Sequence, residues 1–194
     1  MKRNGIDIGM VLTIGSCRIY DAGSCLAICG YRVARIGPRV FTLPQISQLI
    51  YQLIDGKDPS ITPDTFGGFK ACDIFLLEVS SIREEIKGKN IPEAIFKSSL
   101  VDIIKKLEKP VVLVPHILCK NPLTGETPPR RIELFSRLES VALSEGCGFF
   151  NPNQFIDFDT MLTDYDHYNE IGTFAVAMAL VEYLDKFKRS KNII

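Results

Sequence analysis

The chain has 194 residues, 46% of them hydrophobic, and its 23 basic residues balance its 23 acidic residues. This length and composition suit one domain, spanning residues 1–194, with a full hydrophobic core. The zero net charge argues against nucleic acid or an anionic membrane as the main partner. No apolar run approaches the roughly 20 residues of a membrane-spanning helix, and the start of the chain lacks the apolar stretch of a signal peptide.

The six cysteines are spaced irregularly and form no CxxC pair: Cys17, Cys25, Cys29, Cys72, Cys119 and Cys147. A core of this size does not need disulfides, so we expect reduced thiols in a cytoplasmic protein. His116 and Cys119 are isolated candidates for zinc ligands, and without a partner pair no metal site is expected. The dinucleotide and P-loop fingerprints do not occur, so no cofactor is predicted.

Short apolar runs alternate with helical patterns along the chain. Runs typical of buried strands lie at Met10–Ile14, Tyr31–Ile36, Ile74–Val79, Pro110–Pro115 and Gly148–Asn151. Patterns with one apolar helical face lie at Leu43–Ile54, after Pro92, after Pro129 and from about Asn169. This alternation predicts a three-layer, flavodoxin-like α/β sandwich of about five parallel strands with helices on both faces.

Each helical pattern predicts one apolar face. In the helix at Leu43–Ile54 that face holds Ile46, Leu49, Ile50, Leu53 and Ile54, and in the helix after Pro92 it holds Phe96, Leu100, Ile103, Ile104 and Leu107. In the helix after Pro129, the residues expected on the buried face are Ile132, Phe135, Leu138, Val141 and Ala142. In the last helix, they are Phe174, Met178, Val181 and Leu184.

The residues able to take part in catalysis or binding follow the carboxyl ends of the predicted strands. Ligands of parallel sheets bind outside this edge. The first strand leads into Gly-Ser-Cys at residues 15–17, and the third ends at Glu78. The chain has two histidines, His116 and His167, and both fall at the same edge. We therefore expect a nucleophile, a base and an acid to meet there.

His167 can act as a general base if a carboxylate fixes its tautomer. Asp164 stands three residues earlier, in the loop before the last helix, and can fold back onto the imidazole. The structural alternative is that Asp164 or Asp166 caps backbone N–H groups at the start of that helix. These residues alone leave both interpretations open.

The sequence DYDHYNEIG at residues 164–172 resembles the last block of the SGNH, or GDSL-type, hydrolase superfamily. That family begins with a Gly-Asp-Ser turn whose Ser is the nucleophile. The stretch TIGSCR at residues 13–18 is similar to this turn, with Ser16 at the Asp position and Cys17 at the Ser position. GSC-type starts resemble divergent branches, including GSCFA-type proteins and capsular-polysaccharide acyltransferase relatives. The resemblance spans essentially the whole chain and implies the same five-stranded parallel sandwich.

Two adjacent residues are candidates for the nucleophile. Cys17 is favoured by the register and by chemistry, because a thiolate is the better nucleophile and is stabilised by a helix start and a nearby His. Arg18 adds positive charge if its side chain turns inward. Ser16 is the other candidate, or else a capping hydroxyl at the helix start. A buried Cys17 with a capping Ser16 and no turnover is the remaining interpretation.

The middle blocks of the family imply the oxyanion donors. Ser80 falls where the family has an Asn that donates to the oxyanion, and a hydroxyl can also donate there. Gly37 is the best match to the second-block Gly, which supplies a backbone donor, and Gly30 is the next best.

Two further polar residues end apolar strands. A carboxylate such as that of Glu78 must be paired or reached by solvent. It could pair with Arg83, Arg32 or Arg35, or contact substrate. His116 could line the pocket or bind a backbone carbonyl at the strand end.

Together these residues predict an SGNH-like esterase or acyltransferase that uses Cys17 (or Ser16), His167 and Asp164. The expected substrate is a small-molecule or saccharide acyl ester, with acyl-CoA as a candidate co-substrate for transfer. The alternative is a non-catalytic carbohydrate- or acyl-binding member of the same fold. A weaker third interpretation is a flavin-binding, flavodoxin-like domain. The sequence does not predict an oligomeric state.

Overall fold

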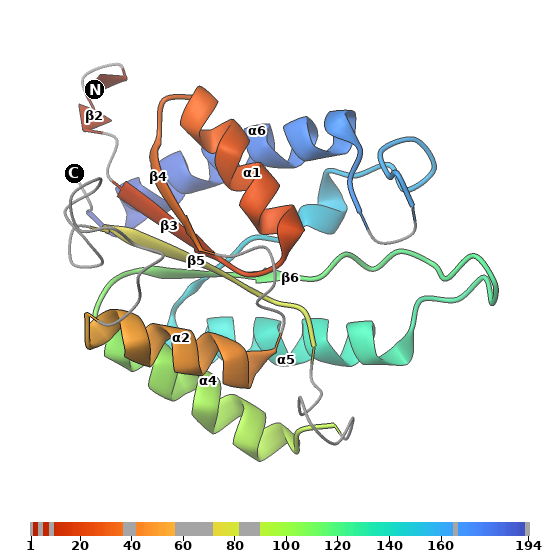
Figure 1. The fold of residues 1–194 in the computed structure, drawn as a ribbon, viewed down its shortest axis with the longest axis horizontal. Helices are drawn as coiled ribbons and strands as arrows, with labels where there is room; N and C mark the ends of the chain where they lie inside the picture. The colour runs from red at the N-terminus through yellow and green to blue at the C-terminus, as the bar shows by residue number, and fades with distance from the viewer. Residues whose placement is uncertain are drawn as a thin grey trace.

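Five parallel strands form the central sheet of the computed structural model (Figure 1). In spatial order they are β4 (Arg32–Ile36), β3 (Met10–Ile14), β5 (Ile74–Val79), β6 (Val111–Pro115) and β7 (Gly148–Phe149). A separate antiparallel pair joins β1 (Lys2–Arg3) to β2 (Ile6–Asp7). The structure describes residues 2–3, 6–7, 10–36, 42–56, 72–81, 90–164 and 167–192, and only the backbone of residues 2, 3, 6, 7, 17 and 20.

The strand order has a reversal between β3 and β5. From β3 the chain first crosses to β4 on one side, whereas β5, β6 and β7 follow on the other side. The connections after β3 and β5 therefore leave toward opposite faces of the sheet. In sheets of this kind, the carboxyl ends of the two strands at such a reversal flank the crevice where ligands bind. The topology thus predicts a ligand site at the residues that follow Ile14 and Leu77.

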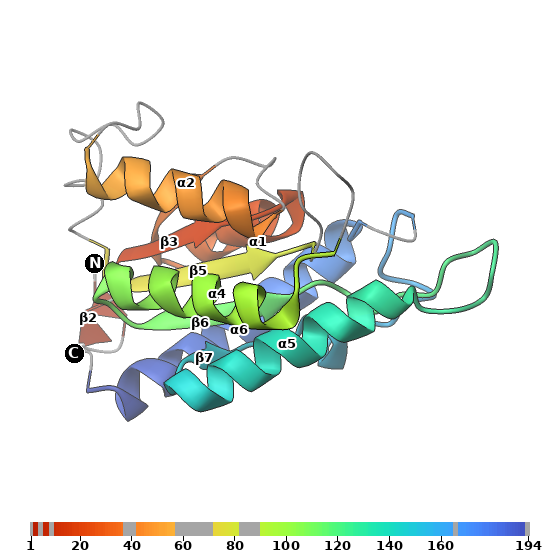
Figure 2. The ribbon, with the colours of Figure 1, turned by 90° about the horizontal axis from the view of Figure 1, so that it is seen from below.

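Among the described helices, two cover one face of the sheet and three cover the other (Figure 2). The first layer contains α1 (Cys17–Ile28) and α6 (Glu170–Ser190). The second contains α2 (Leu43–Ile54), α4 (Glu93–Leu107) and α5 (Pro129–Glu145). A short 3-10 turn, η2, lies at Pro152–Gln154 between β7 and α6.

Strands β3, β5 and β6 each contribute to two separate cores, because successive side chains point to opposite faces. In β5, Phe75 and Leu77 pack with α2, α4 and α5. Ile74 and Leu76 pack on the other face, with α1 and α6. Glu78 is next in this second series. The alternation therefore delivers one carboxylate to the α1 side of the sheet, at the end of the strand.

Local signals in the sequence set the ends of the helices. Before α2, Thr42 and Gln45 form a reciprocal capping box, in which each side chain binds the backbone N–H of the other residue at 3.4 and 3.0 Å. Before α6, Oδ1 of Asn169 accepts a hydrogen bond of 2.9 Å from the N–H of Gly172. Gly146 ends α5 with a φ of 65°, which glycine adopts without strain.

The predicted fold class is confirmed, but one predicted core position on each of α5 and α6 is wrong, and Ile54, expected on the apolar face of α2, is 41% exposed. Ile132 of α5 is 51% exposed and Phe174 of α6 is 58% exposed. The buried faces of these helices begin at Leu134 and Val176, apart from the glycine in the first turn of α6. Each wrong residue stands two positions earlier, about 200° around the helix axis, and so points to the opposite side. The described helices include none long and apolar enough to cross a membrane.

Candidate active site

The turn after β3 packs directly against the end of β5. A Cβ atom at Gly15 would lie 2.6 Å from Cβ of Glu78 and 2.8 Å from Cγ2 of Ile19. These separations are too short for any side chain, so the close approach of the two strand ends requires glycine. Ser16 follows as the N-cap residue of α1, and Cys17 is the first residue of the helix. The side chain of Cys17 lies outside the part of the chain that the structure describes.

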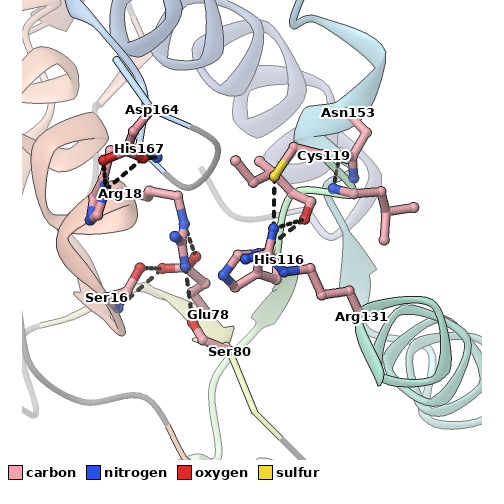
Figure 3. Close-up of polar contacts among 12 residues, drawn as sticks. Ser16, Arg18, Glu78, Ser80, His116, Cys119, Arg131, Asn153, Asp164 and His167 are labelled. Atoms are coloured by element: carbon pink, nitrogen blue, oxygen red, sulfur yellow. Dashed lines mark hydrogen bonds and ion pairs between the residues drawn. The ribbon is translucent and has the colours of Figure 1, made fainter. Parts of the chain in front are cut away.

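A buried polar network joins this turn to Glu78 (Figure 3). The backbone N–H of Ser16 donates to Oε2 of Glu78 at 3.1 Å, and the Ser16 hydroxyl donates to the same oxygen. The Nε–H of Arg18 donates to Oε1 of Glu78 at 3.0 Å. All three residues are at most 5% exposed. The network therefore lies inside the protein, at the reversal between β3 and β5.

The charge of Glu78 is stabilised by its neighbours. Burial alone raises the pKa of this carboxyl, but the Arg18 guanidinium, the nearby His116 and the hydrogen bond from Ser16 outweigh it. The pKa of Glu78 consequently lies below its ordinary value. Glu78 is thus a buried, ionised carboxylate whose two oxygens both accept hydrogen bonds.

Two sequence expectations about this network need correction. The structure pairs Glu78 with Arg18, which was not among the three arginines expected as its partner. The reason is that Glu78 points toward α1, and Arg18 is the second residue of that helix. The alternative in which the Ser16 hydroxyl caps α1 is also wrong, because that hydroxyl makes no capping hydrogen bond. Of the arginines expected as partners, Arg83 lies outside the described residues.

The other residues predicted at this edge have separate positions. The Ser80 hydroxyl accepts a hydrogen bond from Nη2 of Arg18 at 3.3 Å, which leaves its own hydrogen for a further partner. His116 is buried, with Nδ1 3.0 Å from the backbone oxygen of Ile117. Gly37 lies outside the described residues. Gly30 follows the carboxyl end of α1, the end opposite to Cys17, so the structure contradicts its use as an oxyanion donor there.

Asp164 and His167 form the pair that their spacing predicts (Figure 3). Nδ1 of His167 lies 3.0 Å from Oδ2 of Asp164, and the backbone N–H of His167 donates to Oδ1 at 2.9 Å. The carboxylate therefore holds both the ring and the main chain of the histidine. With Nδ1 donating to Asp164, Nε2 is the nitrogen able to accept a proton. About half of each side chain is exposed, so solvent and small molecules reach the pair.

The loop that carries this pair is fastened to the start of α6. The backbone N–H of Asn169 donates to the oxygen of Met161 at 3.1 Å, and its side-chain amide donates to the oxygen of Thr160 at 2.8 Å. Within the loop, the N–H of Thr163 donates to the oxygen of His167 at 2.9 Å. A Cβ atom at Gly172 would lie 2.2 Å from the oxygen of Met161, so only glycine permits this approach.

Tyr168 connects the exposed pair to the buried network. It follows His167 directly and pairs with Leu162 across the loop. Burial raises the pKa of Tyr168 above its ordinary value, the nearby Glu78 carboxylate raises it further, and Arg18 opposes this. The charges of Glu78 and Arg18 therefore both act on the pKa of Tyr168. Tyr168 thus lies near the ends of β3 and β5.

No protein-family model and no curated protein sequence matches the chain. Solved structures do match. An acetylxylan esterase from Geobacillus stearothermophilus has a TM-score of 0.63 and 12% identity, with 92% of this chain and 96% of that chain covered. A carbohydrate acetylesterase from Sinorhizobium meliloti has a TM-score of 0.62 and 12% identity, with 92% and 99% covered. A member of the lipolytic G-D-S-L family from Veillonella parvula has a TM-score of 0.61 and 13% identity, with 89% and 96% covered.

The chain has the same three-layer α/β fold as these two solved esterases and this lipolytic G-D-S-L protein. A cavity of about 580 Å³ has Asp164 in its wall. Its other lining residues come from the segments after β6 and β7, and are Leu118, Cys119, Lys120, Thr127, Ile156, Asp157, Phe158, Asp159 and Leu162. The described residues contain no cluster of three histidine, cysteine or carboxylate side chains that could hold a metal ion.

Sequence reasoning missed the position of Tyr168 and the pairing of Arg18 with Glu78. A signal for the pairing was present, because the alternation of β5 places Glu78 on the same face as Ile74 and Leu76. That face packs against the helix that begins at Cys17. No pattern in the sequence indicated that Tyr168 lies within reach of both charges.

Proposed function

We propose that the protein is an SGNH-like esterase or acyltransferase, with Cys17 as nucleophile, His167 as general base and Asp164 as the residue that orients the base. The observation that carries the proposal is the Asp164–His167 pair, whose carboxylate fixes the imidazole at the carboxyl edge of the sheet. The solved structures with the same fold include an acetylxylan esterase and a carbohydrate acetylesterase, which supports an acyl ester as substrate.

The buried network favours Cys17 over Ser16 as the nucleophile. Ser16 is fully buried, and both its N–H and its hydroxyl bind Glu78. Its hydroxyl would have to leave a carboxylate to attack a substrate. Cys17 occupies the first position of α1, where the backbone N–H groups of a helix start stabilise a thiolate. We therefore assign the attack to the thiol.

The proposed reaction has two steps. The Cys17 thiolate attacks the acyl carbonyl, and His167, which holds the thiol proton on Nε2, returns it to the leaving alcohol as the carbon–oxygen bond breaks. The product is an acyl thioester on Cys17. His167 then removes a proton from water, or from an acceptor hydroxyl, which attacks the thioester and restores the thiol. The Cys17 N–H and the Ser80 hydroxyl are the proposed donors to the oxyanion.

The class of the substrate and the acyl donor are also proposed. An acyl saccharide is the proposed substrate class, supported by the carbohydrate esterases that share the fold. If the reaction is transfer, acyl-CoA is the proposed donor and release of free CoA thiol would reveal it.

The test is hydrolysis of p-nitrophenyl acetate by the wild-type protein and single variants. Cys17→Ala and His167→Ala should each abolish turnover, because they remove the nucleophile and the base. Cys25→Ala is the matched control, since Cys25 is a partly exposed cysteine two turns further along α1. It should keep wild-type activity. Turnover that survives both Cys17→Ala and His167→Ala would end this mechanism.

The rate of alkylation separates the enzyme from a non-catalytic relative of the same fold. We expect iodoacetamide to label Cys17 rapidly at pH 7, and His167→Ala to slow the labelling at least about tenfold, because the imidazole no longer stabilises the thiolate. Peptide mass spectrometry distinguishes Cys17 from the other thiols. Slow labelling that is independent of His167, together with no turnover, would identify a binding protein instead.

A further inference from the structure

Three sulfur-containing side chains gather where α1 packs on α6 (Figure 1). The Cys29 thiol, at the end of α1, lies 3.7 Å from the thioether sulfur of Met178 on α6. Cys25 stands one helical turn before Cys29, because the backbone N–H of Cys29 donates to the oxygen of Cys25 at 3.0 Å. All three side chains are half-buried. We refer to Cys25, Cys29 and Met178 as the sulfur cluster.

The thiols of Cys25 and Cys29 share one face of α1. Residues four apart on a helix have Cβ atoms about 5–6 Å from one another. This face meets α6, since Cys29 contacts Met178 there. Burial raises the pKa of the Cys25 thiol, and the charges of Cys29 and Asp21 raise it further. The effect of Cys29 shows independently that the two thiols are neighbours.

The spacing of Cys29 and Met178 suits two sulfur ligands of one metal ion. With metal–sulfur bonds of about 2.3 Å and trigonal or tetrahedral angles, two ligand sulfurs lie about 3.8–4.0 Å apart. The observed 3.7 Å is close to this range, so these two sulfurs are already placed to bind one ion. The arrangement depends on how α6 lies against α1, which is why the spacing of the cysteines in the sequence did not predict it.

We propose that the sulfur cluster binds one Cu(I) ion, with the thiolates of Cys25 and Cys29 and the thioether of Met178 as ligands. Rotation about the Cα–Cβ bond of Cys25 brings in the third sulfur. Thiolate and thioether ligands together select the soft ion Cu(I), whereas zinc sites use Cys, His and carboxylate ligands. Each thiol releases its proton on binding, so one Cu(I) and two thiols give a complex of charge −1 and two protons.

The site lies away from the candidate active site but joins the two helices that flank it. Cys17 begins α1, and α6 begins shortly after His167. At a rise of 1.5 Å per residue, Cys29 lies about 18 Å from Cys17 along α1. A bound ion would therefore hold the two helices together without touching the proposed reacting groups. Copper binding does not depend on the proposed esterase or acyltransferase function.

The test is a titration of the reduced protein with Cu(I), without oxygen and in competition with the chromogenic chelator bicinchoninate. We expect the wild-type protein to retain one equivalent of Cu(I). Removing a group that only orients a metal ligand lowers affinity about 10–100-fold. Removing a thiolate ligand, in Cys25→Ser or Cys29→Ser, should therefore lower it at least about 100-fold. Met178→Leu should lower it about tenfold, because a thioether is the weaker ligand.

Cys147→Ser is the matched control, because Cys147 is also a half-buried thiol but stands next to β7, outside the sulfur cluster. It should leave the affinity for Cu(I) unchanged. Failure of the wild-type protein to retain Cu(I) against the chelator would overturn the proposal. Equal losses of affinity in Cys29→Ser and Cys147→Ser would do the same, because the ion would then be held by thiols elsewhere.

X-ray absorption by the copper-loaded protein tests the ligand set directly. We expect three sulfur neighbours of the copper at about 2.3 Å, and two in Met178→Leu. Nitrogen or oxygen ligands, or three sulfurs in both proteins, would contradict the assignment. Raising the pH from 7 to 8 should also raise the affinity at least about tenfold, because binding releases thiol protons. An affinity independent of pH would contradict binding by the two thiolates.

Discussion

Two carboxylate pairs lie at the carboxyl edge of the sheet, and they are built in opposite ways. The Glu78–Arg18 pair is buried, with side chains 3% and 5% exposed, whereas the Asp164–His167 pair is about half exposed. An exposed ion pair contributes only about 0–1 kcal/mol to stability, but a buried charge that loses its partner costs several kcal/mol. The contrast separates two roles. The first pair fixes the strand ends, and the second is accessible for proton transfer.

The largest expected effect is on the buried pair. Glu78→Ala should lower the free energy of unfolding by about 3–5 kcal/mol, because it leaves the Arg18 charge buried without its carboxylate. Urea unfolding at pH 7, followed by circular dichroism, measures this. Asp164→Ala is the matched control on the exposed pair and should change the free energy of unfolding by less than about 1 kcal/mol. Equal losses of unfolding free energy in Glu78→Ala and Asp164→Ala would contradict the difference in role between the buried and the exposed pair.

The second prediction concerns the exposed pair, for which we expect a loss of activity with little change in stability. Asp164→Asn should lower kcat/KM for p-nitrophenyl acetate by about 10²-fold or more, because an amide no longer fixes the imidazole tautomer that accepts the proton. Its free energy of unfolding should stay within about 1 kcal/mol of wild type. Steady-state kinetics and urea unfolding on the same preparation check both. Wild-type kinetics would mean that the carboxylate only shapes the loop.

The third prediction concerns the Ser16 hydroxyl, which donates to Glu78 from the residue beside the proposed nucleophile. Ser16→Ala should cost about 1–3 kcal/mol of unfolding free energy, since it removes a hydrogen bond to a buried charge. Turnover should remain, because Cys17 is intact. If Ser16→Ala abolished turnover while Cys17→Ala kept it, Ser16 would be the nucleophile and the assignment made from burial would be wrong.

The fourth prediction follows the charge of Glu78 with pH. Its pKa is lower in the folded protein than its ordinary value of 4.5, so its ionised form stabilises the fold above pH 4.5. That contribution is lost as the pH falls through the lowered pKa. Urea midpoints measured from pH 7 to pH 3 should therefore fall more steeply for wild type than for Glu78→Gln. Parallel curves would show that Glu78 does not carry this dependence.

The fold was predictable because its strands are continuous apolar runs. The runs at Met10–Ile14 and Ile74–Val79 coincide with β3 and β5, and the last helix begins directly after Asn169, close to where the helical pattern begins. Periodicity predicted the faces of the helices less well. The spacing of apolar residues shows which of them share a helical face, but it does not show which face packs on the sheet. For this reason Phe174 was predicted to be in the core.

The candidate site was predictable where it depends on local spacing. Asp164 and His167 are three residues apart, and their contact needs only the loop between them. The partner of Glu78 depends on how α1 lies over the sheet, which is a long-range property. Arg18 stands 60 residues away in the sequence, so spacing alone could not distinguish it from other arginines.

Gly172 has a consequence for how the base can move. Gly172 packs against the oxygen of Met161, and Asn169 donates hydrogen bonds to the oxygens of Thr160 and Met161, so these loop residues are joined directly to the start of α6. A ligand that draws His167 toward the sheet must also tilt the amino end of α6. We therefore expect a movement of His167 to be accompanied by a movement of the helix start, and a single methyl group added at position 172 to push the loop and the helix apart.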